Sequence, residues 1–111
     1  MKKLTLVLTA EEIAATLTPI YECFNRDSKT AYEIRRDFPE TLFDPNTGTP
    51  VEVCETRVRN YENRIYGIER MLAKTCGVEF SHCDHFSPCH EYEKVYMSVN
   101  GKAYPVFRAD E

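Results

Sequence analysis

The sequence predicts an α+β fold with a helical N-terminal region, one long helix and a small three-stranded sheet that ends in an Asn-Gly hairpin. Two observations favour this class. Apolar residues recur every three or four positions across residues 51–72, and Asn100-Gly101 separates two strand-like runs. A chain of 111 residues, 42% hydrophobic and 29% charged, is ordinary for a globular protein. We therefore expect residues 1–111 to form a single domain.

The N-terminal region, residues 1–39, is expected to contain a strand followed by short helices. Lys3–Leu8 is short and mostly apolar, which favours a strand. Thr9 and Glu12 have the spacing of a capping box, in which each side chain accepts from the backbone N–H of the other residue. Pro19 removes a backbone donor and clashes with the preceding turn. We therefore expect a kink or a new helix start at Pro19.

Residues 50–76 are predicted to form the long helix. Thr49 is the expected cap, Pro50 suits the first helical position, and Gly77 is expected to end the helix. Seven residues with alternating spacings of three and four form a heptad seam: Val51, Cys54, Val58, Tyr61, Ile65, Ile68 and Leu72.

This heptad seam has two interpretations. In a parallel homodimer through residues 51–72, Arg57 would meet Glu62 of the second chain and Arg64 would meet Glu69 of the second chain. A single amphipathic helix that lies on the core of its own chain shows the same apolar stripe. The sequence leaves both interpretations open.

Residues 94–108 are predicted to form a β-hairpin, because Asn-Gly is typical of a two-residue type I′ turn. The register that this turn sets pairs Val95 with Val106. It also places Pro105 at an outer edge, where its missing donor is harmless. By elimination, Lys3–Leu8 is expected to pair with the first strand of this hairpin and complete the sheet.

Residues 76–90 are predicted to form a Cys/His loop that binds zinc. Six potential ligands occur in these fifteen residues: Cys76, His82, Cys83, His85, Cys89 and His90. Structural zinc takes four thiolate or imidazole ligands in tetrahedral geometry, and a short irregular segment can wrap around one ion. Five cysteines without a secretory signal favour metal binding or burial over a disulfide scaffold.

The preferred zinc ligands are Cys76, Cys83, His85 and Cys89. His85 is favoured because, in an extended chain, its side chain projects to the same side as that of Cys83. The alternative set is Cys76, His82, His85 and Cys89, and His90 could replace either histidine. Four protein ligands close the coordination shell, so the predicted zinc is structural.

Two other cysteines are excluded from the zinc site. A continuous helix would hold Cys54 roughly 33 Å from Cys76, and Cys23 has no candidate ligand near it in the sequence. Buried or free thiols, and a disulfide or redox role, are the alternatives to zinc.

Charge and motifs exclude several functional classes. A formal net charge of −4 and a pI near 5.4 argue against a surface that binds nucleic acid. No stretch is long enough to span a membrane, and the apolar start lacks a signal-peptide cleavage site. No catalytic motif is recognisable. We therefore expect a non-enzymatic, cytoplasmic protein.

A leucine-rich start that leads into Thr-Ala-Glu-Glu, one long helix and a closing Asn-Gly hairpin are typical of short proteins of bacteriophages and mobile elements. With Cys76–His90 included, the chain resembles the zinc-containing anti-CRISPR inhibitors of type II systems. That resemblance implies a protein that binds a Cas9 nuclease in a bacterial host and blocks its use of DNA.

Two functional hypotheses follow from the sequence. The first is a zinc-stabilised binding protein that inhibits a larger macromolecule by occupying its surface, with four candidate exposed aromatics: Tyr61, Tyr66, Tyr92 and Tyr96. The second is a zinc-containing regulatory or nucleic-acid-binding module that presents four arginines: Arg35, Arg36, Arg57 and Arg64. The net negative charge favours the first hypothesis.

Overall fold

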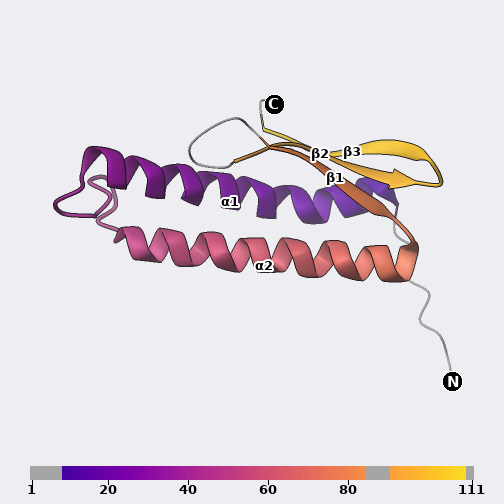
Figure 1. Ribbon diagram of the computed structural model, residues 1–111, viewed down its shortest axis with the longest axis horizontal. Coiled ribbons are helices and arrows are strands. Elements are labelled where there is room, and N and C mark those ends of the chain that lie inside the picture. The colour runs from indigo at the N-terminus through magenta and orange to yellow at the C-terminus, as the bar shows by residue number, and fades with distance from the viewer. Residues whose placement is uncertain (1–8, 85–90, 110–111) are drawn as a thin grey trace, which may run out of the picture.

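Two long helices and a three-stranded antiparallel sheet form two layers in the computed structural model, which describes residues 9–84 and 91–109. The elements are α1 (Ala10–Asp37), α2 (Val51–Cys76), β1 (Glu79–Asp84), β2 (Tyr92–Val99) and β3 (Lys102–Arg108). Figure 1 shows the helices side by side, with the sheet on one face of the pair and towards one end. The predicted α+β class is confirmed.

The N-terminus of α1 is fixed by the predicted capping box. The backbone N–H of Thr9 donates to Glu12 Oε1 at 3.2 Å, and the N–H of Glu12 donates to Thr9 Oγ1 at 3.1 Å. The first turn also carries Glu11, whose charge is favourable at the positive end of the helix dipole. The expected strand Lys3–Leu8 lies outside the described residues.

The new helix start predicted at Pro19 is wrong, because α1 is one helix of 28 residues that contains this proline. The kink, the other expectation at Pro19, stays a prediction. Leu17 and Tyr21, on either side of Pro19, are both fully buried, whereas Pro19 itself is exposed. Burial of the continuous apolar face on both sides of the proline therefore outweighs the lost backbone hydrogen bond. The separate short helices expected within residues 1–39 are wrong for the same reason.

The long helix has the predicted extent but a different cap. Pro50 is the N-cap of α2 and forms no side-chain capping bond. The hydroxyl of Thr49, the expected cap, instead pairs with that of Thr47 at 2.7 Å. Gly77 adopts the left-handed conformation with a φ of 68°, and its N–H donates to the carbonyl of Ala73 at 3.2 Å, so the predicted stop is confirmed.

The heptad seam of α2 lies against the core of the chain itself. Four of its seven residues are buried and the other three are half-buried: Val51, Cys54, Ile65 and Leu72, then Val58, Tyr61 and Ile68. The single amphipathic helix therefore accounts for the stripe. The homodimer stays a prediction that one chain does not test.

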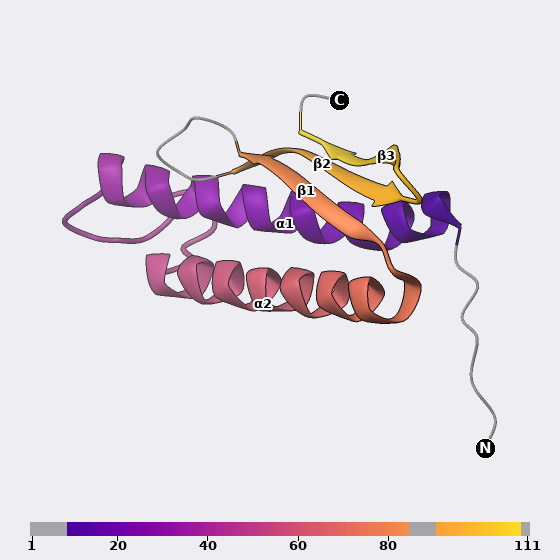
Figure 2. The ribbon, with the colours of Figure 1, turned by 45° about the vertical axis from the view of Figure 1, so that its right-hand side comes forward.

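The sheet has the order β1-β2-β3, so β1 occupies the position expected for Lys3–Leu8 beside β2. This corrects two expectations. The first strand of the hairpin pairs with β1 and not with Lys3–Leu8, and the segment predicted as a Cys/His loop contains a strand from Glu79 onwards. Phe80 packs against the core and His82 contacts α2. Their period of two is the strand signal in this segment, and Figure 2 shows β1 leading back from the end of α2.

The predicted hairpin is confirmed with one change of register. Asn100 and Gly101 have φ values of 52° and 79°, as a type I′ turn requires. Val95 pairs with Phe107 and not with Val106, because a bulge follows Pro105. The bulge lets Val106 and Phe107 both be buried.

The sheet is attached to α1 by two polar contacts. Thr18 Oγ1 donates to the carbonyl of Val106 at 2.8 Å. The amide side chain of Asn25 bonds both backbone groups of Tyr92, donating to the carbonyl and accepting from the N–H, each at 2.8 Å. Beyond Asn25, α1 continues for 12 residues to Asp37, a length of about 18 Å. The helix pair therefore extends past this attachment.

Replacement of Pro19 by Ala should stabilise the protein by roughly 2 kcal/mol, because alanine restores the backbone donor inside α1 while losing a smaller entropic benefit of proline in the unfolded chain. Urea unfolding would measure the gain. Thr16→Ala, at another exposed position of α1, is the control. A variant no more stable than the wild type would mean that the helix is already interrupted at Pro19.

Candidate functional site

The structure places the predicted zinc ligands only in part. Cys76 is exposed at the last position of α2. The backbone of Cys83 lies in β1, opposite Lys94. His85, Cys89 and His90 lie outside the described residues. Within residues 9–84 and 91–109, the structure contains no group of three or more His, Cys, Asp or Glu side chains that could hold a metal ion.

The residue before Cys83 contacts α2 about two turns before the end of that helix. His82, which precedes Cys83, contacts Glu69 of α2. Glu69 lies seven residues before Cys76 on the same helix, or about 10 Å along its axis. The zinc site stays a prediction.

A buried carboxylate joins three elements beneath the sheet. Glu69 of α2 is 8% exposed, and its Oε2 accepts a hydrogen bond from the hydroxyl of Tyr21 in α1 at 2.5 Å. The same oxygen lies 2.8 Å from Nε2 of His82 in β1. Two hydrogen bonds to one buried carboxylate offset the cost of removing it from water. This cluster therefore holds α1, α2 and β1 together.

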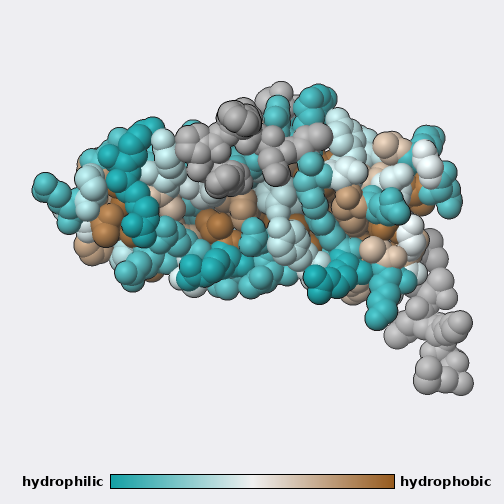
Figure 3. All heavy atoms as spheres, viewed as in Figure 1, coloured by the Kyte–Doolittle hydropathy of each residue, from teal (hydrophilic) through white to brown (hydrophobic). Residues whose placement is uncertain are grey.

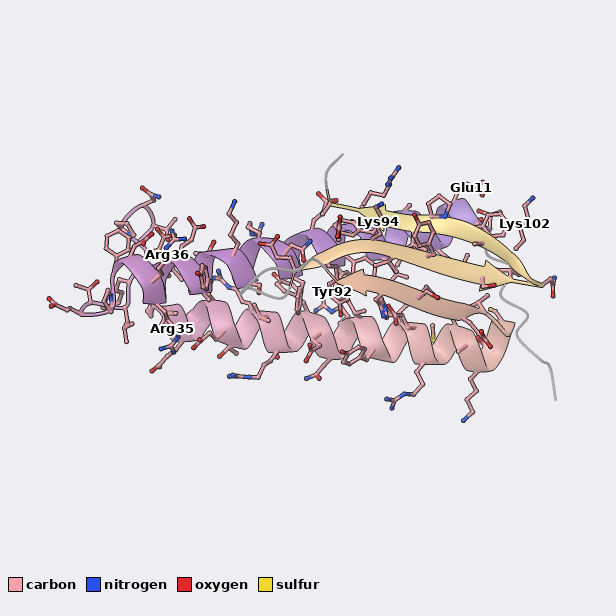
Figure 4. The ribbon with its side chains drawn as sticks, turned by 45° about the horizontal axis from the view of Figure 1, so that its top comes forward. Glu11, Arg35, Arg36, Tyr92, Lys94 and Lys102 are labelled. Carbon is pink, nitrogen blue, oxygen red and sulfur yellow. The ribbon has the colours of Figure 1, made fainter. Side chains whose placement is uncertain are left out.

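Burial controls the ionisation of the two tyrosines in this region. Burial and the hydrogen bond to Glu69 raise the pKa of Tyr21 above its ordinary value. Burial also raises the pKa of Tyr92, with smaller effects from Tyr66 and Glu69. The Tyr21 and Tyr92 rings pack edge to face with centroids 5.0 Å apart. Figure 4 shows Tyr92 between the sheet and the helices.

The sequence did not identify Glu69 as a buried group. The homodimer interpretation places Glu69 on a flank of the heptad seam, where it would pair with Arg64 of a second chain. A signal was present, however, because Glu69 is four residues after Ile65 and three before Leu72, both of which are buried. A carboxylate in the middle of an apolar stripe indicates a buried polar contact.

A second buried carboxylate lies between the helices. Asp27 is 4% exposed, with Arg26 at 3.6 Å and Arg57 at 4.0 Å as its cationic neighbours. Its Oδ2 atom has no hydrogen-bond partner among the described residues. The charge of Asp27 raises the pKa of the Cys54 thiol, although burial of that thiol has the larger effect. The elevated pKa keeps Cys54 in its neutral form, which is a poor metal ligand.

A cleft of about 450 Å³ lies between α1 and β3. Thr18 and Glu22 line it from α1, and residues 105–108 line it from β3. Its charged groups come from Glu22 and Arg108. Neither a nucleophile with an adjacent base nor a set of metal ligands occurs among these lining residues, so we assign no chemistry to this cleft.

The end of the helix pair furthest from the sheet carries exposed apolar side chains. We call this end, residues 33–55, the hairpin tip, because α1, the connection and α2 form a helical hairpin that is separate from the β-hairpin of β2 and β3. Phe38 is 40% exposed at the end of α1, Phe43 is 48% exposed in the connection, and Val53 is 38% exposed in the first turn of α2. Figure 3 shows apolar surface among hydrophilic side chains at this end of the molecule. The hairpin tip therefore offers a surface for contacts outside the chain.

The hairpin tip has its own small core and a closed connection. Its core consists of Ala31, Ile34, Leu42, Val51 and Cys54. In the connection, the N–H of Val51 donates to the carbonyl of Leu42 at 2.8 Å, and Gly48 N–H donates to the carbonyl of Asp44 at 2.7 Å. Arg35 also donates two hydrogen bonds, both 2.8 Å, to the carboxylate of Glu55 across the helix pair. The exposed apolar side chains are thus held on an ordered support.

The structure also places the aromatic and arginine side chains that the sequence singled out. Of the four tyrosines, Tyr66 is 46% exposed, whereas Tyr92 is buried, which corrects the expectation that it is available to a partner. Arg35, Arg36 and Arg57 each lie beside a carboxylate, as their salt bridges show. Three of the four arginines of the nucleic-acid hypothesis therefore have a carboxylate partner, whereas Arg64 is exposed and forms no salt bridge within the described residues.

Glu69→Gln should destabilise the protein by about 1–3 kcal/mol, because an amide oxygen cannot accept strong hydrogen bonds from both Tyr21 and His82. Urea unfolding at neutral pH would measure the loss. Glu62→Gln, two turns earlier on the same side of α2, should change the stability by less than about 0.5 kcal/mol. Equal effects of the two substitutions would contradict the proposed role of Glu69.

The raised tyrosine pKa values predict a loss of stability at alkaline pH. The unfolded chain ionises its tyrosines near pH 10, whereas the folded chain keeps Tyr21 and Tyr92 protonated. Their stabilising effect is therefore complete below pH 10 and falls as pH rises above it. Tyr21→Phe should reduce the slope of stability against pH, between pH 10 and 11.5, by about 1.4 kcal/mol per pH unit.

Urea unfolding at a series of pH values tests this slope, with Tyr96→Phe as the control at a half-buried position. A slope that Tyr21→Phe leaves unchanged would show that Tyr21 ionises as readily in the folded chain as in the unfolded one.

Comparisons of this chain with protein-family models, curated proteins and solved structures found no match. No helix among the described residues is both long enough and apolar enough to cross a membrane.

Proposed function

We propose that this chain is a non-enzymatic binding protein that inhibits a larger protein by occupying its surface through the hairpin tip. The observation that carries the proposal is the exposure of Phe38, Phe43 and Val53 at one end of the molecule. Aromatic side chains contribute most of the binding energy in many protein interfaces, and water-exposed aromatic side chains gain stability when a partner buries them.

The support beneath these side chains favours binding. Docking a flexible loop costs conformational entropy, whereas a preorganised surface avoids much of that cost. The small core of the hairpin tip and the double hydrogen bond between Arg35 and Glu55 hold α1 and α2 together at this end. A partner could therefore bind the hairpin tip without first ordering it.

Two finer parts of the proposal rest on the sequence. A structural zinc ion would stabilise the segment between α2 and β2, where His85 and Cys89 are candidate ligands. A Cas9 nuclease, the partner that the anti-CRISPR resemblance implies, is the first protein to test.

The alternative, a nucleic-acid-binding module, has weaker support. Phosphate binding needs cationic side chains that are free to meet the backbone of the nucleic acid. Arg35 and Arg36 at the hairpin tip each donate two hydrogen bonds to a carboxylate, Glu55 and Asp37 respectively. Figure 4 shows both arginines at this end of the helix pair.

The double variant Phe43→Ser/Val53→Ser should lose inhibition and binding without losing its fold, because both side chains are exposed. The first assay is cleavage of a target DNA by a purified Cas9–guide RNA complex at increasing ratios of this chain. We expect inhibition that is complete near one chain per nuclease, and an affinity at least about 30-fold weaker for the double variant, which corresponds to about 2 kcal/mol.

Met71→Ser is the matched control, because Met71 is 49% exposed on α2 but lies outside the hairpin tip. It should inhibit as the wild type does. If the wild type does not affect Cas9, the same three proteins serve as baits in a bacterial host extract. Retention of the same partner by the double variant as by the control would contradict the assignment of the hairpin tip.

A further inference from the structure

The hairpin tip carries a net charge as large as that of the whole chain. Residues 33–55 contain six acidic residues and two basic ones, a net charge of −4. The whole chain contains 18 acidic and 14 basic residues, so the remainder has 12 of each and a formal charge of zero. The apolar side chains of the hairpin tip therefore lie in a strongly acidic segment of the chain.

Four carboxylates carry this imbalance. The two basic residues of the hairpin tip are paired, Arg35 with Glu55 at 2.8 Å and Arg36 with Asp37 at 2.7 Å. The remaining acidic residues are Glu33, Glu40, Asp44 and Glu52, and within the described part of the chain they form no salt bridge. Like charges gathered in one segment of the chain repel each other.

A hollow on one side of the hairpin tip combines acidic and apolar groups. It has a volume of about 140 Å³ and lies between the end of α1 and the turn that follows. Glu33, Asp37 and Asp44 supply carboxylates to its walls, while Ile34 and Phe38 supply apolar surface. A lysine or arginine side chain fits this combination, because its aliphatic stem can pack on an aromatic ring while its cationic group meets carboxylates.

We propose that the hairpin tip binds a protein surface in which an apolar pocket is rimmed by lysine and arginine side chains. This inference rests on the proposed function and names the chemistry of the partner. The apolar side chains provide affinity when they are buried, and the carboxylates favour a basic rim and speed the encounter. The like-charge repulsion within the free hairpin tip is relieved when the partner's cations arrive.

The basic area of the partner must extend no further than the part of its surface that faces the hairpin tip. In the adjoining turns of the helix pair, the chain carries Lys29 and Arg59, which are exposed and form no salt bridge within the described residues. A partner surface that was basic over a wider area would meet these cations and be repelled. The partner is therefore expected to change from basic to acidic or neutral away from the apolar pocket.

The test uses two triple variants of the full chain with equal changes in charge. The tip variant is Glu33→Gln/Glu40→Gln/Glu52→Gln, and the control is Glu11→Gln/Glu22→Gln/Glu79→Gln, outside the hairpin tip. Each variant loses three negative charges and includes one residue from the first turn of a helix, Glu52 or Glu11. Asp44 is retained because its side chain accepts the N–H of Asn46 and so shapes the connection.

The probe is a bacterial host extract, and the contact is mapped with p-benzoylphenylalanine in place of Phe43 in the full chain. Irradiation links this residue to the protein that it touches, and mass spectrometry identifies the linked peptide. We expect one protein, linked next to lysine or arginine. In 50 mM salt the tip variant should associate with it about 10-fold more slowly than the control variant, and the difference should shrink at 500 mM salt.

The tip variant should also be at least as stable to urea as the control variant, because each loses one favourable first-turn charge but only the tip variant relieves repulsion within the hairpin tip. A purely structural role of the tip carboxylates predicts a less stable tip variant. Equal association rates for the two variants, or links to an acidic surface, would overturn the basic rim and leave the proposed function intact. No link from position 43, together with normal binding by Phe43→Ser/Val53→Ser, would overturn both.

Discussion

The buried carboxylate of Glu69 is the constraint on which the arrangement of the layers depends. A carboxylate removed from water without partners destabilises a fold by several kcal/mol, so any stable arrangement must bring hydrogen-bond donors to it. The donors come from two other elements, Tyr21 of α1 and His82 of β1. Asn25 places β2 in a similar way, by bonding both backbone groups of Tyr92. These contacts fix where the sheet lies on the helix pair.

The unequal lengths of the elements then divide the molecule into two ends. α1 has 28 residues and a length of about 42 Å, whereas the eight residues of β2 span about 26 Å. With the sheet fixed towards one end, the helices extend past it. The small core at the hairpin tip accommodates Ile34 and Val51 but leaves Phe38 and Phe43 at the surface. The exposed apolar end is therefore a consequence of helix length and sheet position together.

Elements with strong local signals could be predicted from the sequence, and elements decided by tertiary packing could not. The apolar period of α2, its stop at Gly77 and the Asn-Gly turn are local and were predicted correctly. The continuity of α1 through Pro19 depends on burial of residues on both sides of it. The strand β1 was missed because its histidine and its cysteine indicated metal binding, which concealed the period of two at Phe80 and His82.

The candidate site was less predictable than the fold, because its residues are defined by exposure and by distant partners. His82 was a candidate zinc ligand on the strength of its sequence neighbours, yet its described partner is Glu69, 13 residues away. Tyr92 was expected at the surface and is buried, while Phe43, in a turn-rich segment, is exposed. The sequence gives the type of each residue, whereas its exposure to a partner depends on its position in the fold. The acidic residues near Phe43 can be counted in the sequence. Only the structure shows that they surround exposed apolar side chains at one end of the helix pair.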